Sequence, residues 1–223
     1  MPAVVTDFDR PDEELVDRFE PLPVAVLADV TGSPTAMDHG ITPVAPAPAM
    51  VGTAVTVRTP ARDNLMVHKA VTLAEPGDVI VVDTGGFTEG AVWGDLLSTS
   101  ATVQRLSGTV VDGAVRDRAD IADLGYPVFS RALSPKNCDK VAGGEINVPI
   151  ECGGRVVNPG DIIVGDGDGV AVVDPAAAPA IADRARAKLD REEEIREAVS
   201  EGAYIYDLLD LEATYGELDL EEN

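Results

Sequence analysis

The stretch that most constrains the fold spans residues 90–121 and reads GAVWGDLLSTSATVQRLSGTVVDGAVRDRADI. We interpret it as a loop, a helix beginning at Gly94-Asp95, a strand over residues 108–112 and a second loop that carries Arg116-Asp117. A strand–helix–strand crossover places the start of the helix and the end of the strand on the same rim of a sheet. The stretch therefore predicts an α/β fold in which these charged residues surround one cleft.

The predicted helix start favours the binding of an anion. Gly94 precedes Asp95, and an aspartate at this position is typical of a helix N-cap. The backbone N–H groups of Leu96 and Leu97 would then point outward, with the positive end of the helix dipole behind them. A small carboxylate is the kind of ligand that such groups bind.

The three charged side chains of the cleft indicate a divalent cation and a 2-oxo acid. Mg²⁺ takes one or two carboxylates and keeps several waters, so we expect Asp117 to bind the metal directly and Asp95 to act through a metal-bound water. Arg116 would lie against the oxygen that becomes an enolate, where it and the metal stabilise the charge. No lysine lies near this stretch in the sequence, which argues against a Schiff-base mechanism.

A purely structural interpretation of the same residues stays open at this point. Asp95 could serve only as an N-cap, which stabilises a helix by about 1 kcal/mol. Arg116-Asp117 could form only a surface ion pair, which is worth roughly 0–1 kcal/mol. The spacing alone does not separate the two interpretations.

The remaining sequence predicts more strands than helices. Strands are expected over residues 51–58, 79–83, 127–131, 146–150, 154–157, 162–166 and 170–173. Helices are expected over residues 12–19, 64–73, 119–124 and 175–199, a glycine-rich loop over 84–90, and either helix or strand over 24–30. This pattern indicates an α/β sandwich with mixed strands. No G-x-G-x-x-G sequence or P-loop lysine follows a strand, which argues against a doubly wound nucleotide fold.

The charge of the chain excludes some partners. Asp and Glu number 40 against 17 Lys and Arg, which gives a formal net charge of −23. Such a chain repels nucleic acid and anionic membrane surfaces. Solubility alone could explain the charge, but only four of the 17 cations are lysines, which favours a halophilic protein that folds in concentrated salt.

The two cysteines, Cys138 and Cys152, are expected to be free thiols, because no signal peptide directs the chain to an oxidising compartment. No stretch approaches 18 apolar residues, so we expect no membrane span and a cytoplasmic protein.

Other polar residues have weaker claims on a site. His39 and His68 are the only histidines, and their different contexts argue against a shared metal site. Asp63-Asn64 is expected to cap a helix, and Trp93 is expected to pack in the core rather than to line the pocket.

At Asp95 and Arg116-Asp117 the chain resembles the RraA-like family, which includes the 4-hydroxy-4-methyl-2-oxoglutarate aldolases. The aldolase signature of that family is an Asp, twenty intervening residues and Arg-Asp, and the chain matches it fully. The surrounding sequence is also similar, in VGTAVTVRTPARDN, PGDVIVVD, GDLLSTSA, GTVVDGAVRD, GYPVFSR and PGDIIVGDGDGVAVV. The similarity covers roughly residues 24–175.

The resemblance implies a β/β/α sandwich with a mixed sheet, like the swivelling phosphohistidine domains. It divides the chain into an N-terminal extension (1–22), an RraA-like catalytic domain (23–175), and a C-terminal helix with an acidic tail (176–223). The last part would pack on the same domain or on a neighbouring subunit. The implied assembly is a homotrimer or a dimer of trimers.

The resemblance also implies metal-dependent (class II) retro-aldol cleavage of 4-hydroxy-4-methyl-2-oxoglutarate or a similar 2-oxo acid to pyruvate, with oxaloacetate decarboxylation as a related activity. The implied roles are Mg²⁺ or Mn²⁺ binding by Asp117, contact with the pyruvate oxygen by Arg116, an ordered water on Asp95, and substrate carboxylate binding at Gly94, Leu96 and Leu97. Glu192, Glu193 or Glu194 of a neighbouring subunit are candidates to complete the site. The resemblance also allows Asp63-Asn64, expected to cap a helix, to line the cleft. The alternative that the family offers is an RraA-type protein-binding regulator of ribonuclease activity without catalysis.

Overall fold

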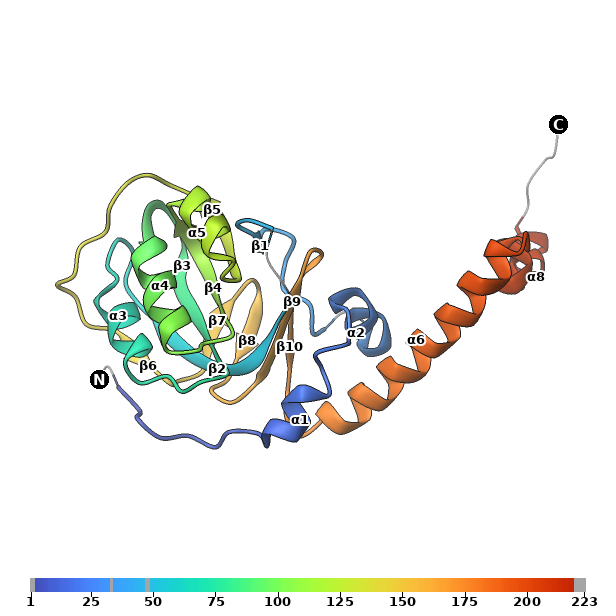
Figure 1. Ribbon diagram of the computed structural model, residues 1–223, viewed down its shortest axis with the longest axis horizontal. Coiled ribbons are helices and arrows are strands. Elements are labelled where there is room, and N and C mark those ends of the chain that lie inside the picture. Colours follow the sequence, from blue (N-terminus) through green and yellow to red (C-terminus); the bar gives the residue numbers. More distant parts are fainter. Residues whose placement is uncertain (1–2, 33, 47–48, 219–223) are drawn as a thin grey trace.

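Four parallel strands form the centre of the sheet in the computed structural model, which describes residues 3–32, 34–46 and 49–218 (Figure 1). They lie in the order β5-β4-β3-β2 and span Met50–Arg58 (β2), Asp78–Trp93 (β3), Gly108–Val115 (β4) and Val128–Leu133 (β5). Antiparallel partners extend this sheet: Thr42–Pro43 (β1) beside β5, Ile162–Asp166 (β9) and Glu145–Ile146 (β6) beside β2, and Gly169–Val173 (β10) beside β9. The predicted mixed α/β fold is therefore confirmed.

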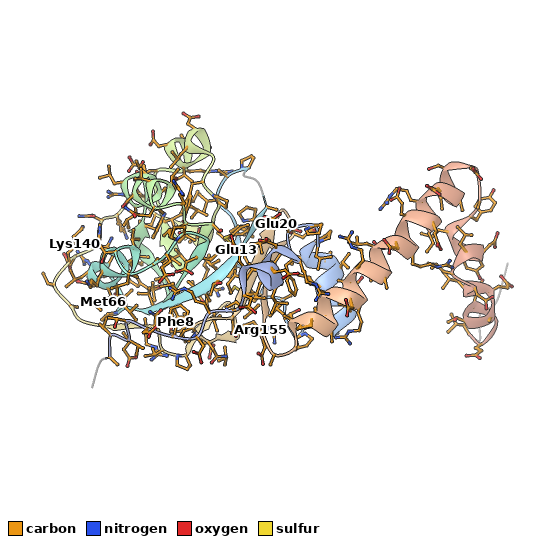
Figure 2. All side chains as sticks on the ribbon, turned by 60° about the horizontal axis from the view of Figure 1, so that its bottom comes forward. Phe8, Glu13, Glu20, Met66, Lys140 and Arg155 are labelled. Atoms are coloured by element: carbon orange, nitrogen blue, oxygen red, sulfur yellow. The ribbon has the colours of Figure 1, made fainter. Side chains whose placement is uncertain are left out.

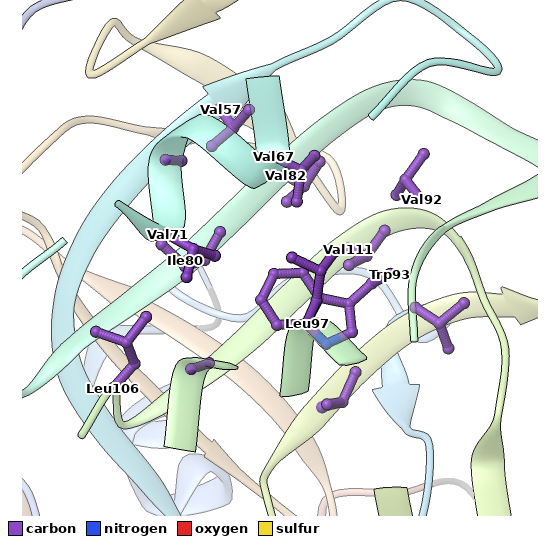
Figure 3. Packing of buried hydrophobic residues seen from close by; sticks show 14 of the residues in the cluster. Val57, Val67, Val71, Ile80, Val82, Val92, Trp93, Leu97, Leu106 and Val111 are labelled. Carbon is purple, nitrogen blue, oxygen red and sulfur yellow. The ribbon is translucent and has the colours of Figure 1, made fainter. Parts of the chain in front are cut away.

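Both faces of the parallel strands are covered. The helices Leu65–Val71 (α3), Asp95–Val103 (α4) and Arg118–Leu124 (α5) pack on one face (Figure 1). Figure 3 shows Val67 and Leu97 of the first two helices among the buried side chains of the sheet. A hairpin of Ile150–Cys152 (β7) and Arg155–Val157 (β8) packs on the other face. Side chains alternate along β3, so that Ile80 and Val82 face the helices while Val79 and Val81 face the hairpin. Burial on both sides explains why this strand is a continuous apolar run in the sequence.

A third layer covers β9 and β10. The short helix Glu13–Asp17 (α1), the helix Val24–Thr31 (α2) and the long helix Ala178–Ser200 (α6) lie at this end of the sheet (Figure 1). Only the first turns of α6 are buried, through Ala178, Ile181, Ala182 and Ala185. Its remainder projects from the body and ends in Ile205–Leu208 (α7) and Leu211–Gly216 (α8) (Figures 1 and 2).

The N-terminal segment runs along the body and contacts it at several points. The backbone N–H of Val5 donates to the Ile146 carbonyl at 3.1 Å, and the Arg10 guanidinium pairs with Asp78 at 2.9 Å. In the part of the chain that the structure describes, no helix is both long and apolar enough to cross a bilayer.

Two local predictions differ from the structure, and one open choice is decided. Residues 84–90 are not a loop, because β3 continues through them with register shifts against β4, and Gly85 and Gly86 take positive φ angles of 67° and 72°. Residues 146–150 do not form one strand, because Asn147 has a φ of 55° and Pro149 lacks a backbone donor. Residues 24–30, which the sequence left undecided, are helical.

Candidate active site

Strand pairing brings the two ends of the motif together. Trp93, the last residue of β3, pairs with Val115, the last residue of β4. The Arg116 N–H donates to the Trp93 carbonyl at 3.1 Å, so Gly94 and Arg116 leave the sheet side by side. Trp93 fixes this point in the core, where it is 1% exposed and its indole N–H donates to Ser98 Oγ at 2.8 Å (Figure 3). The predicted crossover geometry is therefore present.

Asp117 occupies an unusual backbone position between two helices. It precedes α5 as the N-cap residue with φ 60° and ψ 40°, a left-handed conformation that aspartate tolerates better than most residues. Its Oδ2 atom accepts the Asp95 N–H at 3.4 Å and the Arg116 Nε–H at 3.2 Å. Its Oδ1 atom accepts no hydrogen bond from the described residues. One carboxylate oxygen is thus held and the other is available to a ligand.

Gly94, not Asp95, is the N-cap of α4. Gly94 has extended backbone angles, and Asp95 is the first helical residue, so the prediction of an Asp95 N-cap is wrong by one position. The reason is close packing: a Cβ on Gly94 would lie 2.6 Å from Asp117 Oδ2. The Asp95 carboxylate makes no hydrogen bond or ion pair with any described residue, so capping does not explain it.

The first turn of α4 leaves donors without acceptors. The Ser98 N–H donates to the Gly94 carbonyl at 3.0 Å and closes the turn. Leu96 and Leu97 come before Ser98 in the first turn, and their N–H groups have no acceptor among the described residues. These are the donors that the sequence predicted for a carboxylate ligand.

One cavity of about 100 Å³ is lined by all the site residues that were predicted within one chain. Its lining comprises Gly94, Asp95, Leu96, Leu97, Arg116 and Asp117, together with Asn64, His68, Ala91, Trp93, Asn137 and Lys140. Trp93 therefore both packs in the core and borders the cavity, although only packing was expected.

Three polar lining residues, His68, Asn137 and Lys140, were not predicted as part of the cleft, and Asn64 lines it as well as capping a helix. Asn64 is the N-cap of α3; its Nδ2 donates to the Val92 carbonyl at 2.9 Å, while its buried Oδ1 has no partner in the described structure. His68 lies one turn further along α3, and burial and the charge of Lys140 lower its pKa. Asn137 Oδ1 accepts from Arg116 Nη1 at 3.4 Å.

A sequence signal for these residues did exist. The segment after β2 is also a crossover, so the start of α3 reaches the same rim as the start of α4. The loop with Asn137 and Lys140 follows the carboxyl end of β5, which lies parallel to β4. Ligands of open parallel sheets bind outside the carboxyl ends of the strands, so both segments were candidates.

The expectation that no lysine lies near the motif is wrong in three dimensions, because Lys140 lies close to it. This lysine is distant in sequence but borders the same cavity as Arg116. Lys140 is exposed, and a Schiff-base lysine needs a desolvated amine, so its presence does not favour that mechanism. His39 does not border this cavity, so the two histidines do not share it.

The other predicted residues lie elsewhere in the chain. Glu192, Glu193 and Glu194 are on the projecting part of α6, away from α4, and pair with Lys188, Arg196 and Arg191 respectively (Figure 1). Cys138 and Cys152 are buried free thiols, as predicted, and burial raises the pKa of each.

A larger cavity of about 620 Å³ lies beside Arg58, Asp83 and Glu145. The Arg58 guanidinium already pairs with both carboxylates there, so it offers no free cation to an anionic ligand. The smaller cavity combines free donors with free carboxylate oxygens and is the better candidate site.

Fold and cavity together define a mixed α/β sandwich with carboxylates, a guanidinium and a helix N-terminus at the carboxyl rim of its parallel strands. The chain belongs to the RraA-like family, whose model, described as Aldolase/RraA, matches residues 13–172.

Several known proteins are similar to this chain. A protein of Halalkalibacterium halodurans named "Putative 4-hydroxy-4-methyl-2-oxoglutarate aldolase" is 36% identical over 188 residues, which cover 84% of this chain and 90% of the relative. An uncharacterized Pseudomonas syringae protein of known structure has a TM-score of 0.81 at 30% identity, over 90% of this chain and 95% of that one. Streptomyces coelicolor RraAS2, described as an unusual member of the RNase ES inhibitor RraA protein family, has a TM-score of 0.77 at 28% identity, over 85% and 99% of the two chains.

Proposed function

We propose that this protein is a divalent-metal-dependent lyase that cleaves a short 2-oxo acid to pyruvate. The proposed substrate is 4-hydroxy-4-methyl-2-oxoglutarate or a close analogue, with oxaloacetate decarboxylation as a second activity. The observation that carries this proposal is the shared cavity of Asp95, Arg116, Asp117 and the free N–H groups of α4. The name of the Halalkalibacterium halodurans relative points to the same reaction.

The residues of the cavity fit Mg²⁺ or Mn²⁺. Asp117 Oδ1 and the Asp95 carboxylate lack partners among the described residues, and one or two carboxylates with several waters are the usual protein ligands of Mg²⁺. We assign the direct contact to Asp117, because its other oxygen is already fixed by two donors, and the water-mediated contact to Asp95. A cation held here would supply Lewis acidity to the 2-oxo group of the substrate.

The chain itself binds and polarises the 2-oxo acid in this proposal. The Leu96 and Leu97 N–H groups hold the substrate carboxylate, with the positive end of α4 behind them. The Arg116 guanidinium donates to the 2-oxo oxygen. In the retro-aldol step the C3–C4 bond breaks, its electron pair moves toward that oxygen to form an enolate, and C4 becomes a carbonyl as the 4-hydroxyl proton passes to the water held by Asp95. The enolate carbon C3 then takes up a proton from water, which gives pyruvate. Arg116 stabilises the negative charge that the oxygen gains.

A direct assay tests the lyase. Purified protein is incubated with 4-hydroxy-4-methyl-2-oxoglutarate or oxaloacetate, with Mg²⁺ or Mn²⁺, at low and molar salt, and pyruvate is measured. We expect pyruvate from the wild type, and at least a 100-fold lower rate from Arg116→Gln, which removes the charge at the developing oxyanion. Absence of pyruvate from both substrates with folded wild-type protein would exclude the proposal.

The sequence also left open an RraA-type regulator of ribonuclease activity. Streptomyces coelicolor RraAS2 is a member of a family of RNase ES inhibitors, but a binding surface has no need of the motif residues. An RNA-cleavage assay with a purified RNase E-type enzyme separates the two functions. If the protein is a regulator, the wild type and Asp117→Ala should inhibit RNA cleavage equally well, and neither should release pyruvate.

We further propose that the active form is a homotrimer or a dimer of trimers. The projecting C-terminal part carries exposed apolar side chains that a single chain leaves uncovered, which are Val199, Tyr204, Ile205, Leu209, Leu211 and Leu218. Such a surface is typical of a subunit contact. Contact through this part would bring Glu192, Glu193 and Glu194 to a neighbouring copy.

Light scattering after size exclusion measures the mass of the assembly. We expect three or six copies, and we expect one of Glu192→Gln, Glu193→Gln and Glu194→Gln to lower kcat at least tenfold without changing the mass. A monomer with full lyase activity would contradict this assignment.

A further inference from the structure

The loop between β5 and β6 holds Lys140 at the edge of the cavity. Asp63 Oδ2 accepts the N–H groups of Val141 and Ala142 at 2.7 and 3.0 Å, directly after the lysine. Directly before it, the Asp139 carbonyl accepts the Asn64 N–H at 3.1 Å. The backbone on both sides of Lys140 is therefore tied to the start of α3, which itself borders the cavity.

Lys140 forms no ion pair with a described carboxylate, although its charge contributes to the lowered pKa of Asp63. Lys136, on the same loop, pairs with Glu89, and Lys188 pairs with Asp29 at 3.2 Å. Lys140 forms no ion pair within residues 3–32, 34–46 and 49–218, although the whole chain has 40 acidic and only 17 basic residues. Lys69 also lacks an ion pair in this part of the chain, but it does not border the cavity.

Lys140 and Arg116 belong to different parts of the lining. Arg116 lies beside the start of α4, where its Nε–H donates a hydrogen bond to Asp117 Oδ2 at 3.2 Å. Lys140 lies with α3, since its charge contributes to the lowered pKa of His68. The cavity thus has one cation in an ion pair beside the proposed pyruvate site, and beside α3 one cation that forms no ion pair with a described residue. Figure 2 shows Lys140 at the end of the molecule opposite the projecting part of α6.

We propose that Lys140 determines specificity by binding the second carboxylate of a dicarboxylic 2-oxo acid. This inference rests on the proposed function, because it takes the first carboxylate and the 2-oxo group to lie at α4 and Arg116. A monocarboxylic 2-oxo acid of the same length would leave the Lys140 ammonium unpaired. The cavity therefore selects substrates with a carboxylate at both ends.

Binding of two non-cleavable ligands tests this role without turnover. 2-Oxoglutarate and 2-oxopentanoate have five carbons each, differ in the distal carboxylate, and lack the 4-hydroxyl that retro-aldol cleavage needs. Isothermal titration with Mg²⁺ compares wild type, Lys140→Met, and the control Lys136→Met on the same loop. We expect wild type and Lys136→Met to bind 2-oxoglutarate about tenfold or more tightly than 2-oxopentanoate, as one charge-assisted contact allows.

Lys140→Met should lose this preference and bind 2-oxopentanoate within twofold of wild type. The inference is overturned if the preference survives in Lys140→Met, if both ligands weaken equally, or if wild type does not bind 2-oxoglutarate. Circular dichroism checks that each variant is folded, and Lys140→Arg, which keeps the charge, should retain the preference.

The outcomes separate this inference from the proposed lyase. If wild type releases no pyruvate but shows a preference that Lys140→Met removes, the lysine assignment stands and the lyase does not. If wild type releases pyruvate and Lys140→Met retains the preference for 2-oxoglutarate, the lyase stands and the lysine assignment does not.

Discussion

A methyl group at position 94 would enter space that Asp117 occupies. A Cβ on Gly94 would lie 2.6 Å from Asp117 Oδ2 and 3.2 Å from Arg116 Cγ, whereas ordinary contacts begin at 3.4 Å. The φ angle of Gly94 is −169°, an extended value that alanine adopts freely. Gly94→Ala therefore acts through this contact and not through backbone strain.

Asp117 would have to move by about 0.8 Å to restore a contact of 3.4 Å from the present 2.6 Å. Its left-handed backbone and the two donors on Oδ2 oppose this shift. A misplacement of 1 Å at a reacting centre costs on the order of 100-fold in rate, which corresponds to ~2.7 kcal/mol. We expect Gly94→Ala to lower kcat by ~30- to 100-fold and to weaken Mg²⁺ binding, with an unfolding free energy lower by only ~1–2 kcal/mol.

Pyruvate release, calorimetric Mg²⁺ titration and urea unfolding measure these three effects. Gly167→Ala is the matched control, because this turn glycine between β9 and β10 has nothing within 4 Å of a new Cβ. The control should match wild type in all three measurements. If Gly94→Ala kept its kcat and its Mg²⁺ affinity within twofold of wild type, the close contact would have no functional meaning.

Three further predictions concern single side chains. Asp117→Asn keeps a side chain that tolerates the left-handed backbone, so Tm should stay within a few degrees while Mg²⁺ binding by calorimetry is lost; retained binding would contradict the metal assignment. Asp112→Ala removes one of the two carboxylate partners of Arg131, with Asp38 as the other, and also the acceptor of the Gly153 N–H. It should lower the unfolding free energy in urea by about 2–3 kcal/mol, and a loss below ~1 kcal/mol would show that these contacts are not stabilising. Burial and Lys140 lower the pKa of His68 from its ordinary 6.5, so the unfolded chain binds more protons just below pH 6.5 and stability falls there as the pH falls. His68→Gln should reduce this slope in urea titrations between about pH 5 and 7, and an unchanged slope would count against the shift.

The convergence of the two motif ends could be predicted, because it depends on a rule of chain topology. Residues that follow parallel strands joined by a crossover share a rim, whatever the details of the loops. The structure also shows the strand register, in which Trp93 at the end of β3 pairs with Val115 at the end of β4. The fold class followed from the strand pattern in the same way.

The exact start of α4 could not be predicted from residue preferences. Aspartate is favoured at N-cap positions, so the sequence placed Asp95 there. The structure gives that position to Gly94, because Asp117 approaches it too closely for any side chain. That approach joins residues that are distant in sequence, and no local preference indicates it.

The place of the loop after β5 made it a candidate segment, but the exact position of Lys140 within it could not be predicted. It depends on the fold of a long loop, and this fold depends on Asp63, whose Oδ2 accepts two N–H groups from the loop. An aspartate before a helix is usually a local cap, and here Asp63 Oδ1 also accepts the Leu65 N–H at 2.9 Å. The second oxygen makes the longer-range contact, which the sequence does not reveal.

The projecting C-terminal segment carries a large part of the negative charge of the protein, away from the folded body. Residues 192–218 contain nine acidic residues and one arginine, so about a third of the net charge of −23 lies outside the three apolar cores. Electrostatic repulsion between the C-terminal segments of different copies acts over a screening length of about 10 Å at 0.1 M salt and about 3 Å at 1 M. Ionic strength can therefore govern how copies approach one another while leaving the body of each intact.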